Sequence, residues 1–181
     1  MLGLNSHTDR RNTMRSHGDS GVAAHYFPLH FGNRWVYEFE TVESVLTQTV
    51  EVVESVTING AEWYILEFAT QGQSMTSQLI FRTMSDQVLQ YNPSRTEESI
   101  VVDFARSSPQ IGDLSIGFPD ERNRTVVLNG HEFVGCMRVT SGYVDSETCM
   151  YAPGVGLLES HGSQGHKILT KAVINGEVVV S

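Results

Sequence analysis

The chain has 181 residues and a hydrophobic fraction of 40 %, which suit one globular domain with a sizeable core and exclude a disordered protein. Its 21 acidic residues exceed its 12 basic residues, for a formal net charge of -9. This balance argues against nucleic acid as a partner, because phosphate neutralisation needs clustered Lys and Arg. No apolar run approaches the roughly 18 residues of a membrane-spanning helix, so no transmembrane segment is expected.

Residues 1–23 are predicted to form a flexible polar tail, and residues 24–181 a single domain. The tail has no apolar signal-peptide core, and it is too polar to bury much surface. Two alternatives stay open. In the first, the tail is what remains after removal of a signal. In the second, the true start lies near Met14.

The dominant period of the domain is two, which is typical of strands. Trp35, Tyr37 and Phe39 alternate with other side chains and predict a strand with one buried face, and residues 46–58 alternate in the same way. Helical spacing is almost absent. The further β-rich runs are residues 62–70, 78–84, 87–91, 100–104, 125–128, 132–140, 147–151, 156–161, 167–174 and 177–180.

Hairpin turns are predicted at three Asn-Gly pairs that follow apolar residues, because both residue types tolerate the positive φ of tight turns. The pairs are residues 59–60, 129–130 and 175–176. At the first pair, a two-residue turn would place Val56 opposite Trp63, whereas a three-residue turn with a bulge would place Val52 opposite Leu66. The sequence leaves both registers open.

Residues 106–124 interrupt the strand pattern with two prolines and two glycines among apolar residues. They predict a long loop packed over one end of the sheet, with a functional lid as the alternative. The remaining strands follow one another closely, which favours an antiparallel meander. The fold class is therefore predicted as all-β, a curled antiparallel meander that forms a barrel or half-barrel of about ten or more strands.

The two cysteines fall on a predicted hairpin whose turn is residues 142–143. This turn would place Cys136 opposite Cys149, and Arg138 opposite Glu147. A cross-strand disulfide is then geometrically possible, and it would indicate an oxidising compartment. Two free thiols that happen to face each other are the alternative.

Two stretches resemble a loosely defined group of bacterial, mostly secreted or lipid-anchored β-rich domains of unassigned function. Residues 28–37, PLHFGNRWVY, are similar to the opening Pro-Leu-x-x-Gly-Asn-x-Trp-x-Tyr of such domains. Residues 130–157 carry Gly-His-Glu-Phe-Val-Gly-Cys and then Tyr-Ala-Pro-Gly-Val-Gly, which look like a second motif pair of the group. The resemblance implies a curled antiparallel sheet located in the periplasm or outside the cell, and it supplies no catalytic residues. A cytoplasmic location is the alternative, since the sequence shows no signal peptide.

No nucleophile elbow, zinc-protease helix, phosphate loop or dinucleotide fingerprint occurs in the sequence. His161 and His166 flank a glycine-rich turn and could converge with Glu159 on a metal ion. We expect the two histidines instead to be solvated loop residues. The prediction is therefore no metal, no cofactor and no identifiable catalytic residue.

A concave sheet face lined by aromatic residues can hold an apolar ligand. The leading hypothesis is therefore a non-enzymatic envelope domain that binds an apolar small molecule or a protein partner. A dry core filled by the same aromatic residues is the alternative. The candidate ligand-lining residues are Trp35, Tyr37, Phe39, Trp63, Tyr64, Phe68, Phe81 and Phe133.

Two other functions are considered. A β-barrel cyclase or isomerase would shape a hydrophobic substrate and need one acid, for which Glu38, Glu67 and Asp103 are candidates by expected burial. A structural or assembly subunit would pair through sheet edges, for which Glu177–Val180 is the candidate strand. The oligomeric state is left open.

Overall fold

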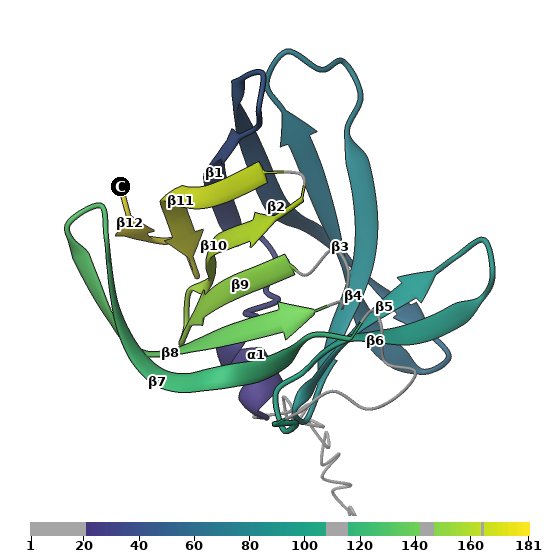
Figure 1. Ribbon diagram of the computed structural model, residues 1–181. Helices are drawn as coiled ribbons and strands as arrows, with labels where there is room; N and C mark the ends of the chain where they lie inside the picture. The colour runs from purple at the N-terminus through teal and green to yellow at the C-terminus, as the bar shows by residue number, and fades with distance from the viewer. Residues whose placement is uncertain (1–20, 108–115, 142–146, 164) are drawn as a thin grey trace, which may run out of the picture.

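The computed structural model describes residues 21–107, 116–141, 147–163 and 165–181 (Figure 1). These residues form one short helix, α1 (Val22–Tyr26), and one twelve-stranded sheet, which confirms the all-β prediction. None of their helices is long and apolar enough to cross a membrane. The strands are β1 (Arg34–Glu40), β2 (Val45–Ile58), β3 (Ala61–Thr70), β4 (Ser77–Met84), β5 (Gln87–Asn92), β6 (Glu97–Asp103), β7 (Phe118–Leu128), β8 (His131–Ser141), β9 (Glu147–Ala152), β10 (Gly156–Gly162), β11 (Gly165–Ile174) and β12 (Glu177–Val180).

The sheet consists of two antiparallel meanders that meet at the first strand. The strands follow the order β6-β5-β4-β3-β2-β1-β11-β10-β9-β8-β7, and β12 pairs with β11 beside this path. Antiparallel pairing of β1 with β11 joins the two meanders. The sheet curls into a nearly closed barrel (Figure 1), as expected for so many twisted strands.

The two edge strands of the sheet, β6 and β7, come together at Gly117. This residue forms a parallel bridge with Val102. Its N–H donates to the carbonyl of Val101 at 2.9 Å, and its own carbonyl accepts from the N–H of Asp103 at 2.8 Å. A Cβ at position 117 would lie 2.8 Å from a side-chain carbon of Val139, so a larger residue would crowd the point where the ring of strands closes.

Helix α1 covers one end of the barrel, at the bottom of the view in Figure 1. The N–H of Ala23 donates to the carbonyl of Ser85 in the β4–β5 turn at 3.1 Å. The N–H of Gly154, in the β9–β10 turn, donates to the carbonyl of His25 at 2.7 Å. Ala23 is fully buried, so the described fold includes residues that the sequence assigns to the tail.

The first Asn-Gly hairpin combines both registers that the sequence left open. Asn59 and the glycine after it have φ values of 52° and 78°, as a two-residue turn of the type favoured in hairpins requires, and Val56 lies opposite Trp63. A bulge between Val52 and Glu54 then shifts the register, so that Val52 lies opposite Leu66. Even-numbered residues of β2 therefore point to one face of the sheet before the bulge and to the other face after it.

The predicted register of the cysteine hairpin is wrong. Ser141 pairs with Glu147 and Val139 pairs with Cys149, so Cys136 does not lie opposite Cys149. The predicted turn itself lies outside the described residues. Cys136 faces β7 instead, and both cysteines are free, which overturns the predicted Cys136–Cys149 disulfide.

The predicted loop over residues 106–124 is also corrected in part. Its last seven residues belong to β7, which pairs with β8, and residues 108–115 lie outside the described chain. Three register shifts interrupt β7, and Asn123 has a φ of 57°. These irregularities hide the strand period, and Pro119 is tolerated because β7 is the last strand of the path.

Candidate functional site

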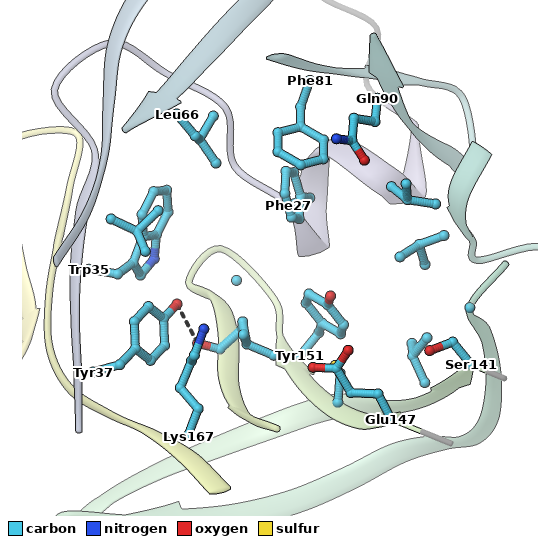
Figure 2. Close-up of a pocket in the computed structure, with 18 of the residues that line it drawn as sticks. Phe27, Trp35, Tyr37, Leu66, Phe81, Gln90, Ser141, Glu147, Tyr151 and Lys167 are labelled. Atoms are coloured by element: carbon cyan, nitrogen blue, oxygen red, sulfur yellow. Dashed lines mark hydrogen bonds between the residues drawn. The ribbon is translucent and has the colours of Figure 1, made fainter. Parts of the chain in front are cut away.

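The concave face of the sheet encloses a cavity of about 390 Å³. Strands from both meanders and the segment after α1 line the cavity. Each strand contributes mainly alternate residues, because successive residues of a strand point to opposite faces. Most of the wall is apolar or aromatic, and a smaller polar group lies at one end (Figure 2). The apolar wall is made of Phe27, Pro28, Trp35, Val50, Leu66, Phe68, Phe81, Val101, Val102, Val139 and Leu157.

Two aromatic side chains of β1 fix the wall to the turn before β10. The indole N–H of Trp35 donates to the carbonyl of Val155 at 2.7 Å, and the Tyr37 hydroxyl donates to the carbonyl of Leu157 at 3.1 Å. Between these carbonyls, Gly156 has a φ of 100°, and a Cβ there would lie 3.5 Å from the indole nitrogen. The Tyr-Ala-Pro-Gly-Val-Gly motif is therefore a bend that carries one wall of the cavity.

Lys167 of β11 provides the cation at the polar end of the cavity. Its ammonium donates to Oε1 of Gln48 at 2.8 Å. It also lies 5.6 Å and 5.7 Å from the ring centroids of Tyr37 and Phe39, within the range of cation–π attraction. Burial lowers the pKa of Lys167, and the negative charge of Glu147 partly opposes this shift.

The other polar groups at this end come mainly from β9, with Ser141 of β8 beside them (Figure 2). Glu147, Cys149 and Tyr151 alternate along the strand and line the cavity with Lys167, as Figure 2 shows for the labelled residues. Burial raises the pKa of the Cys149 thiol to about 12, and the charge of Glu147 adds to the rise. Burial also raises the pKa of Tyr37 and Tyr151. At neutral pH the thiol and both phenols are therefore uncharged, and the thiol is a poor nucleophile.

The polar end continues into a second hollow of about 410 Å³. Lys167 and Glu147 line both spaces, so these two side chains stand at the boundary between them. The second hollow reaches the β10–β11 turn and is lined further by Phe39, Ser160, Gly162, Ser163 and Gly165. A ligand with an apolar body and a polar end would place its body against the apolar walls and its polar end at this boundary.

The eight predicted ligand-lining residues divide into three groups. Trp35, Tyr37, Phe68 and Phe81 line the main cavity, and Phe39 lines the second hollow. The other three predicted liners lie elsewhere. Trp63 packs against Arg82 and Tyr91, the Tyr64 hydroxyl donates to Glu62, and Phe133 lies beside His131.

The three acids considered for catalysis are not among the described residues that line either space. Glu38 is exposed. Glu67 accepts a hydrogen bond from Gln78 at 3.0 Å. Asp103 is buried at the end of β6, where Gln87 donates to it at 2.9 Å.

Sequence reasoning missed Lys167, Glu147 and Tyr151 as site residues. Lys167 shares the inward phase of β11 with the fully buried Leu169, which would have marked it as a charge on the concave face. Glu147 was assigned to Arg138 by the wrong register, although Arg138 pairs with acids of β7. Tyr151 was interpreted only as part of the bend.

Comparison with solved structures finds two of similar fold. A "putative lipoprotein" from Parabacteroides distasonis ATCC 8503 matches with a TM-score of 0.52 and 10 % identity over 84 % of this chain and 97 % of that chain. A "putative exported protein with YmcC-like fold" from Bacteroides fragilis NCTC 9343 matches with a TM-score of 0.52 and 12 % identity over 81 % of this chain and 98 % of that chain. No protein-family model and no curated protein matches the sequence. At these identities the similarity establishes a shared fold, that of bacterial β-rich proteins described as lipoprotein or exported.

Proposed function

We propose that this protein is a non-enzymatic domain of the bacterial envelope that binds an apolar small molecule on its concave face. The cavity of about 390 Å³ carries the proposal. Its volume lies within the roughly 300–1,000 Å³ of small-molecule sites, and its mixture of apolar wall and few polar groups is typical of them. The descriptions of the two structural neighbours as lipoprotein and exported protein support the location.

The chemistry of the walls indicates how such a ligand would lie. An apolar chain or ring would bury its surface against Trp35, Phe68 and Phe81. A polar or anionic end would lie near Lys167, where the neutral phenols of Tyr37 and Tyr151 are further hydrogen-bonding groups. A protein partner remains the alternative occupant.

A cyclase or isomerase is the second candidate, and Lys167 is the observation in its favour. A lysine of lowered pKa in a cavity is a candidate general base. Glu147 is an acid in the same cavity, whereas the three acids expected from the sequence lie outside it. Binding is preferred because most of the wall is apolar and Cys149 is held as a thiol. Pairing through β12 stays a prediction.

Native mass spectrometry of the purified protein tests the proposal first, because a bound apolar molecule would add a discrete mass. A contact quencher then locates the site. The chain has two tryptophans, so Trp63→Phe leaves Trp35 alone in the cavity wall, and Trp35→Phe leaves Trp63 alone. We expect brominated octanoate to quench Trp63→Phe saturably and Trp35→Phe weakly. Equal quenching of the two variants, or none in Trp63→Phe, would refute binding in the cavity.

A further inference from the structure

The outer face of the β10–β11 hairpin gathers two histidines and a carboxylate. Glu159 and His161 are two residues apart on β10 and so point to the same face. His161 lies directly opposite His166 of β11. Because Lys167 points into the cavity, its neighbour His166 points to the opposite, outer face. These three residues are separate from the proposed ligand cavity.

The three side chains already lie at a separation that suits a shared ion. The imidazole rings stack with centroids 3.8 Å apart, and potential ligand atoms of all three residues lie within 4.8 Å of one another. Nε2 of His161 and of His166 lie 4.0 Å and 3.9 Å from the Glu159 carboxylate, too far for a hydrogen bond. Ligands on one zinc ion lie about 3.3 Å apart, so small side-chain rotations would close the site.

His166 supplies a second reason to expect an ion at this place. Its Nε2 is buried and has no hydrogen-bond partner among the described residues. A buried nitrogen without a partner is costly, and Nε2 has a lone pair free to bind a metal when the ring is neutral and carries its proton on Nδ1. A metal ion between His166 and Glu159 would satisfy this nitrogen.

The neighbouring strand β1 adds negative charge beside the histidines. Glu40 lies directly opposite His166, so its side chain is on the same face. Gly165 makes this close approach possible, because it has a φ of 135° and an added Cβ would collide with the carbonyl oxygen of Glu40. Glu40 is therefore placed to offset the charge of a bound cation.

We propose that His161, His166 and Glu159 form a binding site for a first-row transition-metal ion of the Zn²⁺ type. Two imidazole nitrogens and one carboxylate oxygen suit Zn²⁺, whereas Mg²⁺ and Ca²⁺ prefer oxygen ligands alone. The remaining coordination positions face solvent, since His161 is more than half exposed. The ion would exchange with the medium. The two histidines lie on strands β10 and β11, whereas the sequence led us to expect loop residues.

Isothermal titration of the untagged full chain with Zn²⁺, after treatment with a chelator, tests this site. We expect one saturable site that Mg²⁺ does not occupy. His166→Ala and Glu159→Gln should each weaken Zn²⁺ binding by about 100-fold. Removing even a residue that only orients a metal ligand weakens metal binding by about 10- to 100-fold. His131→Ala is the matched control, because His131 also lies beside the turn of a β-hairpin, and it should leave the affinity unchanged.

A second readout keeps the proposal testable if a variant folds poorly. Co²⁺ in the wild-type protein should give visible absorption bands that shift or vanish in His161→Ala, while far-UV circular dichroism shows whether the fold is retained. Equal Zn²⁺ affinity in wild type and in a folded His166→Ala variant would overturn the site. So would a loss of affinity in His131→Ala as large as in His166→Ala.

Discussion

The two tryptophans of this chain are both buried, but they serve opposite faces of the sheet. Trp35 borders the cavity, and its indole N–H is bonded to a backbone carbonyl. Trp63 is on the outer face, where the guanidinium of Arg82 covers its ring at 4.7 Å and its N–H has no partner in the described chain. Arg82 is itself held by Glu98 at 2.7 Å. The concave face leaves room beside its aromatic residues, whereas this part of the outer face is closed by a charged side chain.

The largest difference between the two faces should appear in the free energy of unfolding when each tryptophan is replaced by alanine. Trp63→Ala is expected to lower the free energy of unfolding by about 3–5 kcal/mol, because a fully buried ring leaves an unfilled space. Trp35→Ala should cost less, since one side of its ring already borders a cavity. Urea denaturation followed by circular dichroism measures both. A larger loss for Trp35→Ala would mean that the concave face is the better packed of the two.

The cavity should also protect its cysteine. With the pKa of Cys149 at about 12, its thiolate is scarce at pH 8, and alkylation by iodoacetamide should be at least roughly 100-fold slower in the native protein than in urea. Mass spectrometry of the peptides measures the rate at each cysteine. No added reductant is needed to obtain two reactive thiols in urea. A requirement for reductant would show that Cys136 and Cys149 form a disulfide, contrary to the structure.

The charge at the polar end should contribute to ligand affinity. Lys167→Met in the Trp63→Phe background is expected to weaken binding of brominated octanoate by about tenfold or more, through loss of one charge-assisted hydrogen bond. Lys171→Met on the same strand is the control, because Lys171 is exposed. If both variants lose affinity equally, the effect is long-range charge and not contact at the cavity.

The smallest effect concerns the turn that places Trp63. Gly60→Ala should cost about 1 kcal/mol, because position 60 has a φ of 78° that alanine adopts poorly. Gly162→Ala is the matched control, since its added Cβ would make only ordinary contacts of 3.6 Å or longer. Thermal unfolding compares the two variants. An equal shift in melting temperature would show that backbone conformation at the turn is not the cause.

The fold class could be predicted from the sequence because its signals are local. The period of two and the Asn-Gly turns each depend on neighbouring residues, and all three Asn-Gly pairs have positive φ at both positions. The cysteine hairpin could not be predicted in the same way. Charge pairing favoured Glu147 as the partner of Arg138, but two acids of β7 take that role, at 2.9 Å each. A side chain with several possible partners does not fix a register.

The candidate site was predictable only where the phase of a strand was certain. The regular alternation of β1 predicted that Trp35 and Tyr37 share one face of the sheet, and both line the cavity. Trp63 and Tyr64 are adjacent, so they could not both face inward. The polar end depends on β11, whose place beside β1 follows from pairing across more than 100 residues, and on β9, which reaches the cavity only because β10 links it to β11.

The pairing of β1 with β11 has a consequence for synthesis of the chain. Strands β1 to β6 emerge from the ribosome before β11, so one side of β1 has no partner until residues 165–174 have been made. An unpaired strand edge invites association with other chains, and pairing over such a sequence distance is slow. The first meander should therefore depend on the second to shield it, and closure of the barrel should be a late step in folding.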